Sequence, residues 1–267
     1  MDAGMLNATL LDRHDLTERL AIFRVRPKSS LLPPFLPGQF FRLGLPRNAA
    51  PCNTRGTPDH TGRPRITRRA YSVASPPHVR EWAEFLVVLV EDGKLTPQLW
   101  HVMPGQSLWM DRQASGTFTL ELTPPDRDLV MVATGTGIAP FMSMLRTYAG
   151  QQRWRRFVLI HGVRQVAELA YRAEIEAITR QDASVVYVPV TSREEPPPCG
   201  VRGRVQAALD PDRYEKLTGA SLDPTCCEAF LCGNPRMIDD VGRLLATRGF
   251  TLDRPGRRGN AHFERYW

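Results

Sequence analysis

Two glycines in the turn Gly135-Thr136-Gly137 could bring the backbone close to a phosphate group. The turn joins an apolar run at residues 129–133 to a helical pattern at residues 139–148. The first N–H groups of a helix lack intrahelical partners, and its positive dipole end attracts anions. Pro140 stands where the pattern GxGxxG has its last glycine, and such turns also occur without a ligand. The turn indicates a nucleotide site only together with its neighbours.

Arginines follow the next two predicted strands, where a dinucleotide site meets the adenosine ribose. Arg164 follows the strand at residues 157–162, Ser192 and Arg193 follow the strand at 184–190, and Arg204 comes one loop later. An acid at this place selects NAD, whereas an arginine admits the 2′-phosphate of NADP. Each charge-assisted hydrogen bond contributes about 1.5–3 kcal/mol. The arrangement favours NADP, although any one of these arginines could equally be an ordinary surface residue.

A second strand-to-helix turn has the sequence Cys232-Gly233-Asn234-Pro235. Asn234 can cap the helix, and Pro235 suits its first position. Cys232 is thereby expected where the strand ends and ligands bind, although a cysteine at a strand end is commonly just a small buried hydrophobic residue.

The first half of the chain carries a cation, an aromatic ring and a hydroxyl within the four residues Arg69-Ala70-Tyr71-Ser72. In a strand, Arg69 and Tyr71 share one face and the other two residues share the opposite face. Such a set can bind a phosphate, stack on a flat ring and hydrogen-bond its edge. A second place for anionic oxygens precedes a short predicted helix and consists of Gly93, Lys94, Leu95 and Thr96.

The chain ends with Glu264-Arg265-Tyr266-Trp267. Two terminal aromatic residues either pack on a flat surface or dock as an apolar end.

Two structural units are expected to position these residues. Strands are predicted at 20–25, 39–43, 84–91, 107–111 and 117–122, with a helix at 96–102. After Pro124-Pro125, strands at 129–133, 157–162, 184–190 and 229–232 alternate with helices at 139–148, 166–180 and 235–248. Alternation implies right-handed crossovers and a mostly parallel sheet covered on both faces. We predict a β-barrel unit, residues 1–123, followed by a nucleotide-type α/β unit, residues 126–267.

Composition narrows the class of protein. Of 267 residues, 42% are hydrophobic and 24% charged, which is typical of a globular protein, and no apolar run could span a bilayer. The first residues lack the features of a secretion signal, so we expect a cytoplasmic protein. The five cysteines match no zinc, iron–sulfur or disulfide spacing, so neither metal nor disulfide is predicted.

The net charge of +7 is concentrated in one segment. Residues 42–69 contain seven arginines and one acid, and a long exposed loop is predicted at 46–66. Such a patch attracts an acidic protein, a nucleic acid or a phosphorylated ligand. The charge alone does not show which of these three is the partner.

The motifs, taken in order, resemble those of the ferredoxin–NADP⁺ reductase family over nearly the whole chain. Residues 69–72 resemble its flavin-binding RxYS signature, and residues 93–96 its second flavin phosphate motif. Residues 135–140 and 232–235 resemble its paired nicotinamide-nucleotide motifs, and the ending is most similar to that of bacterial flavodoxin/ferredoxin reductases. The resemblance implies an antiparallel Greek-key barrel that binds FAD and a parallel-sheet domain that binds NADP(H). It implies hydride transfer between NADPH and FAD, and single-electron exchange with ferredoxin or flavodoxin by a monomer that binds neither membrane nor nucleic acid.

The resemblance also implies roles for individual residues. FAD would lie between Tyr71 and Tyr266, with Arg69 and Thr96 on its pyrophosphate, Ser72 near flavin N5 and Trp267 against the adenine. The other expected FAD contacts are Ala70, Gly93, Lys94 and Leu95. NADP would contact Gly135, Thr136, Gly137, Arg164, Ser192, Arg193, Arg204, Cys232 and Gly233. Catalytic roles fall on Ser72, Cys232, Glu264 and Tyr266: Cys232 would border the nicotinamide, and Glu264 would orient groups or balance charge.

Three alternatives remain open at this point. One is an NAD(P)H-dependent reductase component for an oxygenase or another acceptor; such proteins usually carry four spaced cysteines, which this sequence lacks. Another is a flavin-binding redox sensor. The third is a nucleic-acid-binding module, but no aromatic residues for base stacking interleave with the arginines of 46–69.

Overall fold

The computed structural model describes residues 6–28, 31–47 and 65–266 and divides into two compact units, Met1–Thr119 and Leu120–Trp267. Most of the predicted loop 46–66, and Trp267, lie outside the described residues.

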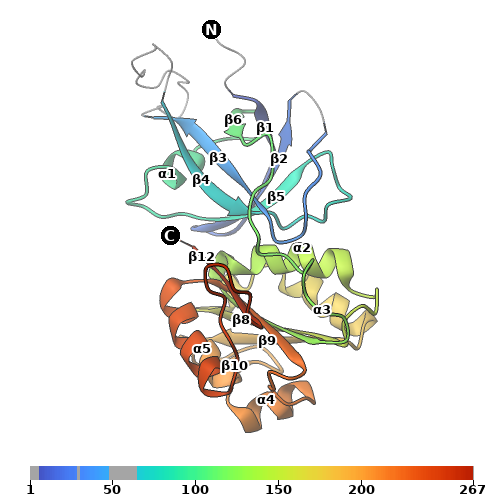
Figure 1. Ribbon diagram of the computed structural model, residues 1–267. Helices are drawn as coiled ribbons and strands as arrows, with labels where there is room; N and C mark the ends of the chain where they lie inside the picture. Colours follow the sequence, from blue (N-terminus) through green and yellow to red (C-terminus); the bar gives the residue numbers. More distant parts are fainter. Residues whose placement is uncertain (1–5, 29–30, 48–64, 267) are drawn as a thin grey trace. The chain divides into compact units, whose positions relative to one another are not determined.

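The first unit contains a six-stranded antiparallel sheet with the strand order β4-β3-β6-β1-β2-β5 (Figure 1). Its elements are β1 (Ala8–Thr17), β2 (Leu20–Pro27), β3 (Phe40–Pro46), β4 (Ile66–Ser72), β5 (Ala83–Val88), α1 (Thr96–Leu99) and β6 (Ser107–Met110). Strand β6 lies between β3 and β1, so neighbours in the sheet are distant in sequence, as in a Greek key. The core of the unit includes the buried side chains of Phe23, Phe41, Phe85 and Leu108.

This sheet is barrel-like but not closed. The two end strands approach just after β4, where Val73 and Phe85 form an antiparallel bridge. The backbone N–H of Ala74 also donates to the carbonyl of Glu84 at 2.8 Å. Within the described residues, pairing between β4 and β5 does not extend into a continuous ladder. The predicted antiparallel fold is confirmed, with this limited contact in place of full closure.

Three sequence predictions for the first half of the chain are wrong in extent or in kind. Residues 117–122 form no strand, the predicted helix 96–102 is the shorter α1, and the predicted strand 84–91 ends with β5 at Val88. Conversely, the sequence pattern does not predict β1, because four consecutive polar residues, Asp12 to Asp15, interrupt the apolar alternation.

The second unit is a doubly wound parallel sheet with the order β10-β9-β8-β7-β11-β12 (Figure 1). Its strands are β7 (Asp128–Thr134), β8 (Arg156–Val163), β9 (Val185–Thr191), β10 (Val201–Arg202), β11 (Cys227–Gly233) and β12 (Ala261–Arg265). The chain runs outward from β7 to β10 and then returns to add β11 on the other side of β7. The switch point between β7 and β11 is where ligands bind in open sheets of this kind, at the carboxyl ends of the strands. We call this end of the sheet the carboxyl edge and the opposite end the amino edge.

Helices cover both faces of the parallel sheet (Figure 1). They are α2 (Ile138–Tyr148), α3 (Arg172–Gln181), α4 (Pro211–Thr218) and α5 (Pro235–Thr247). Helices α4 and α5 pack Tyr214, Ile238 and Val241 on the core of one face, while α2 and α3 lie on the other.

The predicted helix 166–180 is interrupted. A short 3-10 turn at Val166–Glu168 precedes α3, because Tyr171 adopts a left-handed conformation with a φ of 61°. No helix in the described part of the chain is long and apolar enough to cross a membrane.

Candidate functional site

Two glycines bring the ends of β7 and β11 into direct backbone contact. A Cβ atom on Gly137 would overlap the carbonyl oxygen of Cys232, and one on Gly233 would lie 2.5 Å from Oγ1 of Thr134. Gly233 has a φ of +128°, a conformation that favours glycine. The backbone N–H of Asn234 donates to the same Thr134 hydroxyl at 3.0 Å. The two turns therefore form one continuous backbone surface at the switch point.

Helix α2 begins directly after the turn Gly135–Gly137. The first N–H groups of a helix lack intrahelical acceptors and can donate to a ligand. No acidic residue occupies the first turn of α2 or of α5, so no like charge there opposes an anion. This part of the carboxyl edge can hold a phosphate group through the backbone alone.

A buried histidine holds the first turn in place. Nε2 of His161, on β8, lies 3.1 Å from the carbonyl oxygen of Gly135, which has a φ of +54°. Because a carbonyl only accepts, Nε2 carries the proton. Burial lowers the pKa of His161 to about 4, against a smaller raising effect of this hydrogen bond. The ring is therefore neutral at pH 7 and donates to the turn.

His161 is a site residue that sequence reasoning missed. Its Nδ1 is buried and has no hydrogen-bond partner among the described residues. An unpaired buried polar atom costs about 1–3 kcal/mol, so it calls for a functional explanation. The available signal was a polar residue at the carboxyl end of an otherwise apolar strand.

Three predicted catalytic residues meet at the ends of β11 and β12. Cys232 and Glu264 are register partners, and the backbone N–H of Tyr266 donates to the carbonyl of Gly233 at 3.0 Å. Burial raises the pKa of the Cys232 thiol well above its usual value, and Glu264 raises it further, whereas a hydrogen bond with the Tyr266 side chain lowers it. The thiol is thus uncharged at neutral pH and adjoins a carboxylate and a phenol.

The predicted phosphate-binding arginines follow three neighbouring strands. Val163, Thr191 and Arg202 are register partners on β8, β9 and β10, so the residues after them share the carboxyl edge. The backbone N–H of Arg193 donates to the carbonyl of Arg164 at 2.9 Å. The exposed residues that this arrangement gathers are Arg164, Ser192, Arg193 and Arg204.

Two glutamates shape the loops that carry these arginines. The Glu168 carboxylate accepts the backbone N–H of Arg164 at 2.8 Å, and Glu194 accepts that of Val166 at 2.5 Å. Both acids contact backbone N–H groups, and the guanidinium groups of Arg164, Arg193 and Arg204 form no ion pair with any acid in the described residues. These charges remain available to an anionic ligand.

In the first unit, β4 carries Arg69-Ala70-Tyr71-Ser72 beside β3. Tyr71 packs edge-on against Phe85 with ring centroids 6.5 Å apart. Burial raises the pKa of Tyr71, while the nearby Arg69 lowers it. Arg69 and Ala70 are exposed and Ser72 is buried. The cation and the aromatic ring are therefore close together, as expected for residues on one face of a strand.

The segment 93–96 closes a compact loop before α1. The Thr96 hydroxyl donates to the carbonyl of Val90 and accepts its N–H, both at 3.0 Å. A Cβ on Gly93 would lie 2.8 Å from the same carbonyl. Lys94 is exposed and Leu95 is buried in the core. Thr96 thus fixes the loop, and the Lys94 side chain is left exposed on it.

The described residues fit the two cofactors that the motifs imply. The buried Oη of Tyr71 has no hydrogen-bond partner among the described residues, and a hydroxyl-rich ligand such as FAD would supply one. Gly137 lies so close to Cys232 that no side chain would fit at position 137, so the switch point is lined by backbone. A dinucleotide pyrophosphate needs such a close approach to the backbone.

The fold and the site define a class of two-unit nucleotide-dependent oxidoreductase. Residues 131–243 match the model of the oxidoreductase NAD-binding domain. The chain is 32% identical to ferredoxin–NADP reductase A of Sorangium cellulosum, covering 97% of this chain and 89% of that protein. It is likewise 32% identical to the ferredoxin–NADP reductase of Azotobacter vinelandii, covering 96% and 95%.

A solved structure agrees with these relatives. A ferredoxin NADP⁺ reductase from Neisseria gonorrhoeae, crystallised with bound FAD and NADP, has a TM-score of 0.82 at 30% identity, covering 97% of each chain. The chain belongs to the ferredoxin–NADP reductase family.

Proposed function

We propose that this protein is an FAD-dependent oxidoreductase that transfers a hydride between NADPH and FAD and exchanges single electrons with ferredoxin or flavodoxin. The observation that carries the proposal is the carboxyl edge of the parallel sheet. There, two glycine turns in backbone contact adjoin Cys232 and the C-terminal Tyr266. Full-length similarity to reductases of this family supports it.

The first unit would hold FAD. When bound, FAD accepts a hydride and releases electrons singly. Tyr71 offers its ring and its unpaired Oη, and Arg69 offers a charge beside it. Lys94, on the loop that Thr96 closes, offers a second cation for the pyrophosphate. Ser72 on β4 is the candidate for the edge of the flavin ring.

The second unit would hold NADP(H). The N–H groups after Gly135 would bind the pyrophosphate, and His161 keeps that turn in the conformation that presents them. The 2′-phosphate would lie among Arg164, Arg193 and Arg204, with the Ser192 hydroxyl beside them. This arrangement favours NADPH over NADH.

Cys232, Glu264 and Tyr266 would shape the place where the nicotinamide reacts. The Cys232 thiol is neutral and buried, so it contributes a small polarisable surface rather than a nucleophile. Tyr266 would cover the flavin until nicotinamide displaces it, and Glu264 would balance charge. These residues align the reactants, and alignment is how a protein accelerates such a transfer.

We further propose a monomeric cytoplasmic protein with an acidic electron carrier as its partner. The net charge of +7 favours fast, salt-sensitive association with such a carrier. The described cysteines are free, as is typical of a reducing compartment.

The function is tested by NADPH oxidation with purified ferredoxin or flavodoxin, each coupled to a final electron acceptor. We expect turnover that rises with carrier concentration and saturates, well above the rate without a carrier. A rate that is the same with and without either carrier would contradict the proposed partner while leaving NADPH oxidation itself intact.

A further inference from the structure

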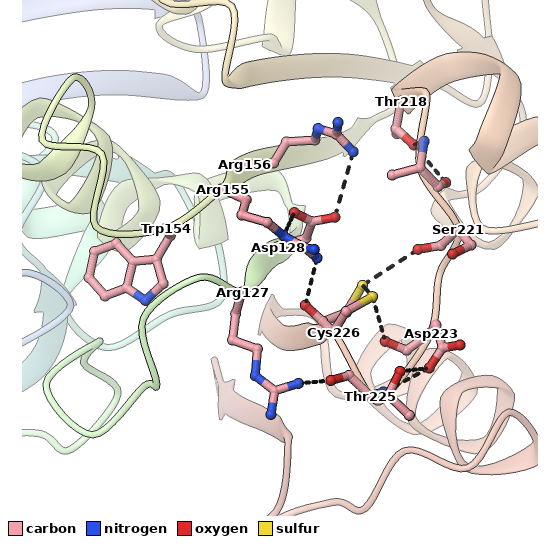
Figure 2. Close-up of polar contacts among 12 residues, drawn as sticks. Arg127, Asp128, Trp154, Arg155, Arg156, Thr218, Ser221, Asp223, Thr225 and Cys226 are labelled. Carbon is pink, nitrogen blue, oxygen red and sulfur yellow. Dashed lines mark hydrogen bonds and ion pairs between the residues drawn. The ribbon is translucent and has the colours of Figure 1, made fainter.

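Two adjacent cysteines, Cys226 and Cys227, lie at the amino edge of the parallel sheet, where β11 begins. Figure 2 shows Cys226 among its neighbours. Cys227 is the first residue of β11 and the register partner of Asp128, the first residue of β7. The carbonyl of Cys226 accepts the backbone N–H of Asp128 at 2.9 Å. The proposed hydride transfer uses neither thiol.

The two sulfur atoms are close and differ in exposure. Their Sγ atoms lie 3.9 Å apart; Cys226 is partly exposed, and Cys227 is fully buried. The Cys226 thiol lies 3.7 Å from the carbonyl oxygen of Asp223, and the Cys227 thiol 3.6 Å from that of Ser221. The turn thus holds both thiols side by side, with one reachable from solvent and the other protected.

A guanidinium group contacts the partly exposed Cys226. Nη2 of Arg155 lies 3.4 Å from the carbonyl oxygen of Cys226, and its Nε donates to Asp128 at 3.2 Å (Figure 2). The pKa of Arg155 is raised first by a hydrogen bond with the Cys226 side chain and then by Asp128. Burial raises the pKa of Cys227 to about 12, so Cys227 is a thiol at neutral pH.

We propose that Cys226 and Cys227 form an oxidant-reactive dithiol, which a hydroperoxide converts to a vicinal disulfide. In the first step, the Cys226 sulfur attacks the peroxide oxygen, the O–O bond breaks, and a sulfenic acid and one hydroxyl compound form. In the second step, the Cys227 sulfur attacks the Cys226 sulfenic acid, the S–O bond breaks, and water leaves. The pair loses two protons and two electrons in total, and the peroxide takes them up.

The disulfide between these two adjacent residues is expected to form reversibly, because its geometry is strained. Adjacent Cα atoms are ~3.8 Å apart across a trans peptide, below the usual range of about 4.4–6.8 Å for disulfides. A strained disulfide has a more oxidising potential, so a thiol reductant reopens it readily. Because Cys226 is partly exposed and Cys227 is buried, the peroxide is expected to react with Cys226, and Cys227 is expected to resolve the intermediate.

Peptide mapping of the flavin-loaded protein tests the proposal. The protein is treated with hydrogen peroxide, free thiols are alkylated, and the chain is cleaved after Glu228, which separates the pair from Cys232. We expect the peptide with both cysteines to be unalkylated and ~2 Da lighter, and dithiothreitol to restore it. Full alkylation of this peptide at peroxide concentrations that oxidise the exposed Cys199 would overturn the proposal.

Three variants sharpen the test. In Cys227→Ser, Cys226 should accumulate as a sulfenic acid that dimedone traps, because no resolving thiol remains. In Cys226→Ser, Cys227 should stay reduced, whereas the matched control Cys199→Ser should form the disulfide as the unsubstituted protein does. Oxidation of Cys227 in Cys226→Ser at the unsubstituted rate would contradict the assigned order.

Discussion

At the scale of single residues, we propose that a preference for NADPH depends on the exposed guanidinium groups of Arg164, Arg193 and Arg204. Arg204→Ala should lower the ratio of kcat/KM for NADPH to that for NADH about tenfold, because one charge-assisted bond contributes about 1.5–3 kcal/mol. Arg202→Ala is a matched control, since Arg202 is also exposed but already pairs with Glu195 at 3.0 Å. Steady-state kinetics with both nucleotides measures the ratio. Equal ratios in the two variants would remove Arg204 from the phosphate site.

His161 connects the site to stability at low pH. Its pKa is about 4 in the folded protein, against 6.5 for an ordinary histidine, so the unfolded chain takes up this proton first as pH falls. The folded state should therefore lose about 3 kcal/mol between pH 6.5 and 4 from this group. His161→Gln keeps a donor for Gly135 but does not titrate, so denaturant unfolding of this variant should lose less stability over that range. Parallel pH profiles of the two proteins would contradict the assignment.

At the scale of elements, the contact between β7 and β11 should tolerate no side chain at Gly137. Gly137→Ala should cost about 3 kcal/mol or more and abolish NADP⁺ binding, because the new Cβ would overlap the Cys232 carbonyl. Gly135→Ala is the contrast: its Cβ meets nothing within 4 Å, and only its φ of +54° makes it costly, by about 1–2 kcal/mol. Thermal unfolding and calorimetric NADP⁺ titration distinguish them. Similar losses in both would mean that the backbone contact is unimportant.

The C-terminal aromatic residues should affect the flavin more than the fold. Removing Tyr266 and Trp267 leaves the β11–β12 pairing and the ion pair between Arg265 and Asp239 in place. Loss of stacking should weaken FAD binding about two- to tenfold and ease nicotinamide access. Tyr266→Phe keeps the ring and should retain FAD as the unsubstituted protein does. FAD affinity and NADPH kinetics that are unchanged in the truncated protein would rule out stacking.

Strands were predictable where apolar residues run continuously. The predicted strand at 157–162 differs from β8 by one residue at each end, because a strand buried on both faces has an unmistakable composition. At residues 117–122, Phe118 and Leu120 are buried as the alternation predicted, but Leu122 is 73% exposed and the chain turns there. Alternating apolar and polar residues indicate which side chains are buried, but they do not show whether a neighbouring strand is present to pair with.

The candidate site was predictable in its motifs but not in its tertiary contacts. The glycine turns and the strand-end arginines are local signals, since they follow apolar runs directly. The bond from His161 to Gly135 depends on the register of β7 with β8, and the meeting of Cys232 with Tyr266 depends on β12, which sequence patterning did not reveal. Register between strands arises from tertiary packing, which one sequence read locally does not display.

At the scale of the whole molecule, the residues assigned to the two cofactors lie on two different structural units. The antiparallel unit carries the residues assigned to FAD, and the doubly wound unit carries those assigned to NADP(H) and the C-terminal tail. Under this proposed assignment, neither unit alone holds all the groups that hydride transfer requires. Activity should therefore depend on both cofactors bound to one chain.

An anaerobic titration of the purified protein with NADPH, and separately with NADH, tests this division most directly. The visible flavin spectrum is followed after each addition. We expect a yellow protein whose absorbance is bleached rapidly by NADPH and poorly by NADH. A colourless protein that also fails to take up added FAD would contradict the flavin-dependent function, and equal bleaching by both nucleotides would contradict the role of the arginines.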